Sequence, residues 1–378
     1  MSLTELDDGL VRSMAIGAVF SDFGGKIRSV GFHRTDDLLV TSSEDDSLRL
    51  FDIANAKHPR NPLNSLTRAL FGLSLSALRL SYFLHSLFTV KMSLTELDDG
   101  LVRSMAIGAV FSDFGGKIRS VGFHRTDDLL VTSSEDDSLR LFDIANAKQV
   151  KVTYHKKHGT DRVCFTHHPS SFICSSLYNL ESTGESLRYL SMYDNRILRY
   201  FKGHKDRVVS LCMSPINDSF MSGSLDRSVR LWDLRVNACQ GILHLRGRPA
   251  VAYDQQGLVF AIAMEGGAVK LFDSRCYDKG PFDTFLVGGD TAEVNDIKFS
   301  NDGKSMLLTT TNNNIYVLDA YHGEKKCGFS LEPSQGTSLE ATFTPDGKYV
   351  LSGSGDGTLH AWNIENPSEV NTEQSKHH

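Results

Sequence analysis

A six-residue pattern recurs along this chain at a nearly constant spacing, and the spacing limits the possible folds more than any other feature. Each occurrence reads small or polar, apolar, basic or polar, apolar, bulky apolar and usually Asp, as in "SVRLWD" at Ser228–Asp233. The bulky fifth position falls at Phe142, Leu190, Trp232, Phe272, Leu318 and Trp362, which lie 40 to 48 residues apart. A period of about 40–45 residues is typical of the blades of a β-propeller.

Two further apolar segments precede most occurrences of the pattern. In the repeat that ends at Asp233 they are "RVVSLCMSP" at Arg207–Pro215 and "SFMSGSLD" at Ser219–Asp226. The first segment of a repeat commonly ends in Pro, Asn, Asp or Gly, which favour tight turns. Short strands joined by turns at even spacing predict an all-β repeat fold.

The amino-terminal part of the chain is present twice. Met1–Lys57 is identical to Met92–Lys148 at every position, the initiator Met included. Loop positions tolerate change and drift apart first in old duplicates. The exact copy therefore indicates either a very recent duplication or an error of gene prediction.

The first copy supplies the strands that a closed ring needs. From Met92 onward the chain has six sets of inner strands, and the sixth, which ends at Trp362–Ile364, has no outer strand after it. We expect that outer strand near Val11–Phe20. A seventh blade is expected from the segments Lys26–Phe32, Leu38–Glu44 and Ser47–Ile53, with Val102–Phe111 as its outer strand. Closure removes exposed strand edges, so the sequence predicts a seven-bladed β-propeller.

This division gives four parts: a duplicated first blade unit (1–57), an insert (58–91), six blades (92–364) and a polar tail (365–378). The insert is rich in Leu and Ser, lacks Asp and Glu, and places Leu residues at helical spacing. Its Arg and His residues disfavour a membrane span. We expect it to loop out of the ring or to be translated non-coding sequence, with an amphipathic helix on a membrane or a partner as the alternative.

Composition excludes several classes of protein. A net charge of −6 and a pI near 6.2 argue against a chain that neutralises many nucleic-acid phosphates directly. The amino terminus has no hydrophobic core of a signal peptide. The six cysteines show no metal-binding spacing and are expected to be buried, reduced thiols of an intracellular protein; they are Cys164, Cys174, Cys212, Cys239, Cys276 and Cys327.

The stretch Gly203–Arg235 resembles a repeat of the WD-repeat family. By position, the family's hydrogen-bonded structural tetrad falls on His204, Ser222, Asp226 and Trp232. A partial set falls on Ser352, Asp356 and Trp362, in a repeat without the Gly-His pair. The other repeats keep the strands but lose the tetrad, and we expect them to be less rigid. A catalytic Ser-His-Asp triad is the alternative interpretation of the first set, but no nucleophile elbow accompanies it.

From about Leu101 to about Ile364 the chain is similar to the WD-repeat subunit of COMPASS-type histone lysine methyltransferase complexes, which also occurs in a nuclear type-1 phosphatase complex. The similarity rests on segments such as "YLSMYDNRILRYFKGH", "NACQG", "YDKGPFDTF" and "LEATFTPDG". It implies a nuclear, non-catalytic scaffold on chromatin near transcribing RNA polymerase II, with no cofactor and no membrane partner. The chain departs from this family in lacking its last blade and in carrying the extra amino-terminal copy.

Two surfaces are candidates for partner binding. The connections that enter the first strand of each blade should share one face, and they carry seven basic residues: Lys156, Lys157, Lys202, Lys205, Arg207, Arg246 and Arg248. Such a cluster would suit a phosphorylated polymerase tail, and ordinary solvated charges are the alternative. The "WDLR" and "FDSR" segments, with Asp233, Arg235, Asp273 and Arg275, resemble the box by which WD-repeat substrate receptors dock on a cullin-RING ubiquitin ligase adaptor.

No motif for nucleotide, dinucleotide or metal chemistry occurs in the chain. His155 and His158, in "HKKH", and the pair His167–His168 are the nearest approach to metal ligands. Histidines in such loops are expected to be solvated instead. The sequence therefore predicts a protein that binds proteins rather than an enzyme.

Overall fold

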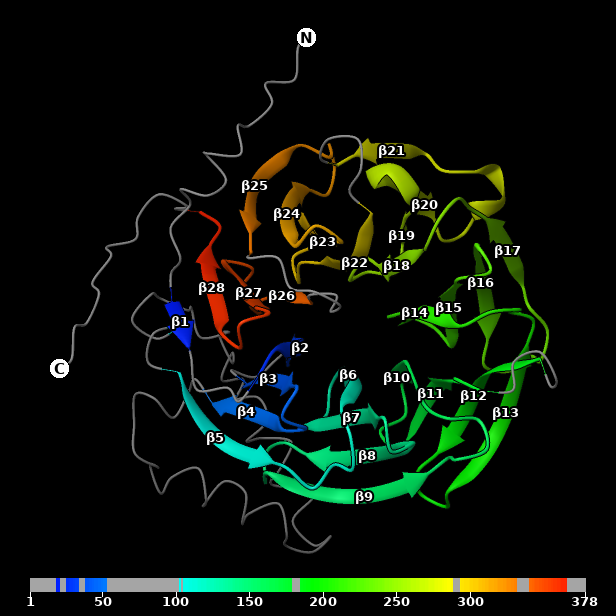
Figure 1. The fold of residues 1–378 in the computed structure, drawn as a ribbon. Coiled ribbons are helices and arrows are strands. Elements are labelled where there is room, and N and C mark those ends of the chain that lie inside the picture. Colours follow the sequence, from blue (N-terminus) through cyan, green and yellow to red (C-terminus); the bar gives the residue numbers. More distant parts are fainter. Residues whose placement is uncertain are drawn as a thin grey trace, which may run out of the picture.

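A computed structural model describes residues 18–20, 25–33, 38–52, 102, 105–178, 184–287, 293–331 and 340–365. Over these residues the chain forms seven antiparallel sheets of four strands each, set around a common axis (Figure 1). The predicted all-β fold and the seven-bladed propeller are both confirmed. Residues 53–101 and 366–378 lie outside the described residues, so the four-part division of the chain stays a prediction.

Each sheet is one blade, and the blades follow one another around the ring. The first two complete blades consist of β2 (Ile27–Phe32), β3 (Leu38–Ser43), β4 (Leu48–Asp52) and β5 (Ala106–Phe111), then β6 (Ile118–Phe123), β7 (Leu129–Ser134), β8 (Ser138–Asp143) and β9 (Lys148–Tyr154). The next two consist of β10 (Val163–Phe165), β11 (Ser171–Ser175), β12 (Glu185–Ser191) and β13 (Arg196–Lys202), then β14 (Val208–Met213), β15 (Ser219–Ser224), β16 (Ser228–Asp233) and β17 (Gly241–His244).

The remaining blades have the same order from the axis outward. They consist of β18 (Ala250–Tyr253), β19 (Val259–Ala263), β20 (Ala268–Asp273) and β21 (Asp283–Leu286), then β22 (Val294–Phe299), β23 (Ser305–Thr310), β24 (Asn314–Asp319) and β25 (Lys325–Ser330), and last β26 (Ala341–Phe343), β27 (Tyr349–Gly353), β28 (Leu359–Asn363) and β1 (Ala18–Phe20). Two short 3-10 turns, η2 (Glu265–Gly267) and η3 (Tyr277–Lys279), flank β20. None of the described segments forms a helix long and apolar enough to cross a membrane.

Burial explains why these segments become strands. The second strand of each blade is sandwiched between neighbouring blades, and β15 and β27 are accordingly buried along nearly their whole length. Outer strands such as β9 and β13 alternate exposed and covered residues, as a sheet with one wet face does. The apolar core lies between blades: Ile173 and Phe201 of one blade pack with Phe220 and Trp232 of the next.

The two identical copies lie side by side and close the ring. β1, from the first copy, pairs with β28 at Ala18↔Ala361, Val19↔His360 and Phe20↔Leu359. β5, the same strand in the second copy, pairs instead with β4 of the first copy. The sheet that contains the carboxyl-terminal strand is therefore completed by the amino-terminal one, as the count of strands predicts (Figure 1). Val11–Gly17 and Ile53 of the predicted strands lie outside the described residues.

A disulfide across the closing strands tests this arrangement. Opposed residues in antiparallel strands lie about 4.5–5.5 Å apart, within reach of a disulfide. Ala18→Cys with Ala361→Cys should therefore cross-link on oxidation and raise the thermal midpoint, because a native-like disulfide contributes about 2–4 kcal/mol. The cross-link is read from peptide masses.

The matched control pairs Ala18→Cys with Leu50→Cys, because Leu50 faces Ala109, the counterpart of Ala18 in the second copy. A cross-link in the control and none in the test pair would show that the first copy does not complete the last blade.

Candidate functional site

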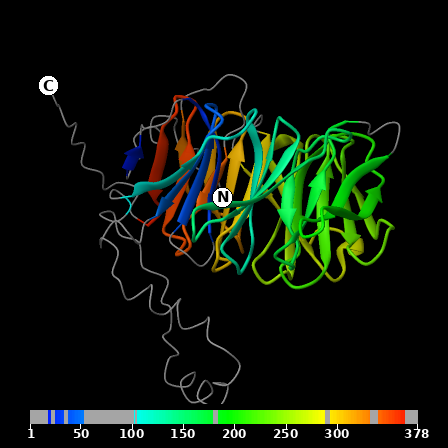
Figure 2. The ribbon, with the colours of Figure 1, turned by 90° about the horizontal axis from the view of Figure 1, so that it is seen from below.

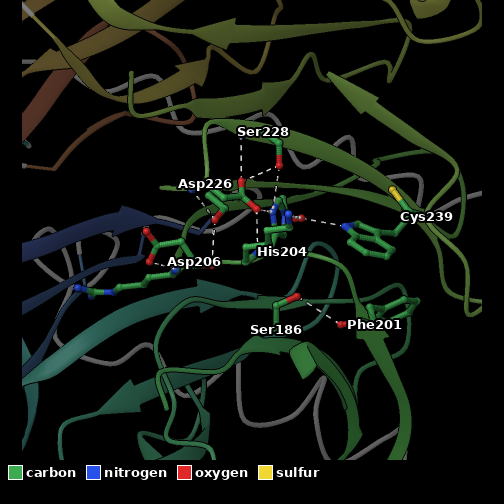
Figure 3. Close-up of polar contacts among 12 residues, drawn as sticks. Ser186, Phe201, His204, Asp206, Asp226, Ser228 and Cys239 are labelled. Atoms are coloured by element: carbon green, nitrogen blue, oxygen red, sulfur yellow. Dashed lines mark hydrogen bonds and ion pairs between the residues drawn. The ribbon is translucent and has the colours of Figure 1, made fainter. Parts of the chain in front are cut away.

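The blade of β14 to β17 contains a continuous chain of hydrogen-bonded side chains, three of them buried and the last, Asp226, half-buried. The Trp232 indole N–H donates to Ser222 Oγ at 2.8 Å, and Ser222 Oγ lies 2.7 Å from His204 Nε2. His204 Nδ1 lies 2.9 Å from the Asp226 carboxylate (Figure 3). One set of proton positions satisfies every link: the hydroxyl donates to Nε2, and the Nδ1–H donates to the carboxylate. The structure thus brings together all four residues of the expected tetrad.

Asp226 connects this network to the loop before the blade. Its carboxylate accepts from the Lys205 N–H at 2.9 Å and from the Ser228 hydroxyl at 2.6 Å. Burial disfavours the charged form of Asp226, but the hydrogen bonds from His204, Ser228 and the Lys205 N–H outweigh it and hold its pKa below the usual range. The carboxylate is therefore charged at neutral pH and fixes the loop to the turn between β15 and β16.

Trp232 packs at the centre of the interface between two blades. The indole is fully buried and lies nearly parallel to the Phe220 ring, with 6.2 Å between the ring centroids. The centroid of the Phe201 ring is 5.5 Å away. Ser222 is also fully buried. A nucleophile in this position could not meet a substrate, so the geometry argues against the alternative of a catalytic triad.

The partial set around Trp362 is arranged differently. Ser352 Oγ donates to the main-chain carbonyls of Glu340 and Gly353. Asp356 accepts from the Thr358 N–H and hydroxyl, and that hydroxyl lies 2.6 Å from His360 Nε2. The His360 ring stacks on the Trp362 indole at 5.5 Å. His360, on the third strand of this blade, therefore lies beside Trp362. The assignment of tetrad residues by sequence position did not identify this histidine.

An arginine performs the tethering role in the duplicated blades. In the second copy, Arg140 donates to Asp136 at 3.1 Å, and the Gly115 N–H donates to the same carboxylate at 3.2 Å. The guanidinium also lies 4.3 Å above the Phe114 ring. The first copy has the corresponding pair Arg49–Asp45 at 2.8 Å. This blade lacks a histidine equivalent to His204, yet its loop is still tied to the Asp136 carboxylate. The recurring Asp-x-Ser-x-Arg spacing is the sequence pattern that could have predicted this contact.

The candidate basic residues lie at the face where the first strand of each blade begins, which we call the entry face. Six of them are exposed and Arg248 is half-buried. Two of the exposed ones are engaged by carboxylates: Lys202 with Glu185 at 3.2 Å and Arg207 with Asp161 at 2.5 Å. The remaining exposed members of the set are Lys156, Lys157, Lys205 and Arg246.

The two Asp-x-Arg boxes lie on the opposite face, which we call the exit face. β14 and β16 run in the same direction, because each is antiparallel to β15, so Asp233 at the end of β16 is far from the start of β14. Figure 2 shows the strands running between these two faces. Arg235 grips Asp233 through Nε at 2.9 Å and Nη2 at 2.7 Å, yet its side chain is 73% exposed.

The second box repeats this geometry on the adjacent blade. Arg275 contacts Asp273 at 3.0 and 2.8 Å and is 75% exposed. The hydrogen bond from the arginine side chain is the largest cause that lowers the pKa of Asp233 and of Asp273. The backbone N–H and the positive charge of the same arginine add to it. Two exposed Arg–Asp ion pairs of the same geometry therefore lie on adjacent blades at the exit face.

The histidines of "HKKH" are not solvated as expected. His158 is buried, 6.2 Å from the Tyr200 ring and 3.7 Å from Glu185. Burial, the nearby Arg188 guanidinium and His158 lower the pKa of His155 to about 4. The sequence analysis did not identify Arg188, which is fully buried and donates to the Gly159 carbonyl beside these histidines. His167 and His168 are exposed, and no cluster of metal-ligating side chains occurs among the described residues.

Comparison with known proteins agrees with this architecture. The sequence profile of the WD domain, G-beta repeat, matches residues 17–52, 108–143, 195–233 and 326–363. The chain is 96% identical over 279 residues to the "Protein ANTHESIS POMOTING FACTOR 1" of Arabidopsis thaliana, covering 74% of this chain and 84% of that protein. It is 40% identical over 284 residues to "WD repeat-containing protein 82" of Drosophila melanogaster, covering 75% and 88%. The "COMPASS component SWD2" of Saccharomyces cerevisiae is 34% identical over 258 residues, covering 66% and 76%.

Trp232 should be a structural anchor rather than a contact for partners. Replacing a buried aromatic side chain with Ala costs about 3–5 kcal/mol, so Trp232→Ala should lower the free energy of unfolding by that amount in urea titrations. Trp232→Phe keeps the packing and loses the indole donor, which should cost roughly 1–3 kcal/mol. If Trp232→Ala weakened partner binding with no loss of stability, this role would be refuted.

His155 should make the fold sensitive to mild acid. The unfolded chain takes up a proton at His155 near pH 6.5, whereas the folded protein resists it until about pH 4. The contribution of His155 to stability is therefore full above about pH 6.5 and is lost as the pH drops toward 4. His155→Gln should flatten this part of the stability profile, and the exposed His167→Gln serves as control. Equal slopes for His155→Gln and the unmodified protein would contradict the assignment.

Proposed function

Because this chain belongs to the WD-repeat family, in the branch with WD repeat-containing protein 82 and COMPASS component SWD2, we propose that it is a non-catalytic scaffold subunit of a nuclear COMPASS-type histone lysine methyltransferase complex. The relative "Set1 complex component swd2" of Schizosaccharomyces pombe, 36% identical over 251 residues, supports the same assignment. The functional residues then bind and position partners and carry out no chemistry.

The observation that carries the proposal is a closed ring of seven blades with exposed charged side chains on two opposite faces. Loops of the entry face and of the exit face lie at opposite ends of the same strands. The buried tetrad and the Asp136–Arg140 pair tie loops of the entry face to their blades. A scaffold of this kind can hold one partner on each face at once, because neither surface needs to rearrange.

The entry face is the proposed binding surface for a phosphorylated RNA polymerase II tail. Lys156, Lys205 and Arg246 are exposed there, and Arg and Lys pair strongly with phosphate. Lys202 and Arg207 already have carboxylate partners, so they would contribute less. Through this surface the chain would link the methyltransferase, and in a second assembly a nuclear type-1 phosphatase, to transcribing polymerase on chromatin.

The exit face supports a second candidate function, that of a substrate receptor in a cullin-RING ubiquitin ligase. This candidate is favoured by the exposed guanidinium groups of Arg235 and Arg275, each of which is oriented by hydrogen bonds to a neighbouring Asp. A pre-oriented guanidinium loses little conformational freedom when it docks on an adaptor.

Affinity purification of the tagged full-length chain separates the two functions. The methyltransferase proposal expects recovery of methyltransferase subunits, and Arg235→Ala should leave both their recovery and the stability of the fold unchanged. The ligase proposal expects a cullin adaptor, whose recovery should fall at least tenfold in Arg235→Ala, because a methyl group cannot replace the donors of a docking arginine.

Arg196→Ala is the matched control, since Arg196 is also an exposed arginine at the exit face that contacts an aspartate, Asp194 at 3.1 Å, and lies outside the two boxes. Absence of methyltransferase, phosphatase and polymerase subunits from the purified material would overturn the main proposal. Absence of a cullin adaptor from the unmodified sample would end the second.

A further inference from the structure

A cavity of about 420 Å³ lies on the axis of the ring. Its walls come from the innermost strands of all seven blades, with Arg162, Arg248, Asn295 and Glu340 at the entry-face end. Apolar residues such as Val251 and Phe343 also line the cavity. The size and the mixture of apolar walls with a few polar groups are those of a ligand pocket.

Hydrogen bonds span both ends of this cavity. Near the exit face Arg125, in the loop after β6, donates to the Gln255 carbonyl after β18 at 3.2 Å. At the entry face the Arg162 guanidinium, just before β10, lies 3.4 Å from the Glu340 carboxylate, just before β26. Two blades lie between the members of each pair, so both contacts cross the axis (Figure 1). The Arg125 contact thus crosses the exit end, and the Arg162–Glu340 pair crosses the entry-face end.

Counted over the described part of the chain, the arginines at the entry-face end outnumber the carboxylates in contact with them. Arg207 is matched by Asp161 and Arg162 by Glu340, but the hydrogen-bond partner of Arg248 is the neutral Asn295 amide. Burial and the nearby Arg162 and Arg207 lower the pKa of Arg248, and Asp296 and Glu293 offset this only in part. Among the residues that the structure describes, the buried Nε of Arg162 also has no hydrogen-bond partner. One further negative charge would satisfy these groups.

We propose that this end of the axial cavity is a binding site for an acidic side chain of a partner peptide, held by Arg162, Arg248 and Asn295, and that Glu340 occupies the site as an internal substitute. An incoming carboxylate displaces Glu340 from Arg162 and gains the Arg248 guanidinium, which hydrogen-bonds the neutral Asn295 amide. The single unmatched charge favours a monoanionic carboxylate over a phosphate dianion. The ligand chain continues toward the apolar wall at Val251 and Phe343.

This site differs from the exposed lysines proposed for the phosphorylated tail. Lys156, Lys205 and Arg246 do not line the cavity. Their contribution to binding is expected to be weak, additive and strongly reduced by salt, whereas charges in a partly buried pocket are screened less. The two surfaces can therefore be told apart by substitution.

The test is a titration of the full-length protein with a short capped peptide that carries a single Glu among Gly and Val residues, followed through the Arg Nε–Hε signals in NMR spectra. Arg248→Gln should weaken binding at least tenfold, and Glu340→Gln should tighten it several-fold because the internal competitor loses its charge. Arg246→Gln, two residues from Arg248 but exposed, should change the affinity less than twofold. Glu340→Ala repeats the competitor test should Glu340→Gln fold poorly.

The opposite signs expected for the arginine and glutamate variants make the result decisive. Equal losses for Arg246→Gln and Arg248→Gln, or no tightening in either Glu340 variant, would overturn the site. A phosphoserine peptide of equal length that binds tenfold more tightly than the Glu peptide and depends on Arg248 would overturn the assignment of a carboxylate ligand.

Discussion

The pairing of β1 with β28 is the constraint on which the rest of this structure depends. β1 covers the outer edge of β28, and without it the last blade would offer that edge as an open template for aggregation. This pairing joins the two ends of the described chain, so each of the seven blades packs between two neighbouring blades. The axial cavity, the two faces and the positions of their loops all follow from that closure.

Polar anchors inside the blades solve the second physical problem, which is how to fix loops without a core of their own. Asp226 and Asp136 occupy equivalent turns and accept from the N–H of the preceding loop in both blades. One blade completes the network with His204 and the other with Arg140. The feature common to both blades is a half-buried, hydrogen-bonded carboxylate, whereas the group beside it is an imidazole in one blade and a guanidinium in the other.

Much of this could be predicted from the sequence because the decisive signals are local. The spacing of the bulky residues gave the blades, and a count of strands placed the first copy against the blade of Trp362. The positions of His204, Ser222, Asp226 and Trp232 follow from their offsets within one repeat. The role of Arg140 was missed because an arginine on a strand reads as a solvated charge, and the burial of His158 was missed because Arg188 lies on a different strand. The Arg162–Glu340 contact joins residues from blades far apart in the chain, so no local pattern encodes it.

Hydrogen exchange at β28 tests the central claim, that the duplicated segment closes a seven-bladed ring, most directly. If β1 covers this strand, the amides of Leu359–Ala361 that face outward should exchange as slowly as the corresponding amides of β4, which β5 covers. Fast exchange at the outer edge of β28, together with slow exchange at β4, would show that the ring is open at the last blade and would contradict the account.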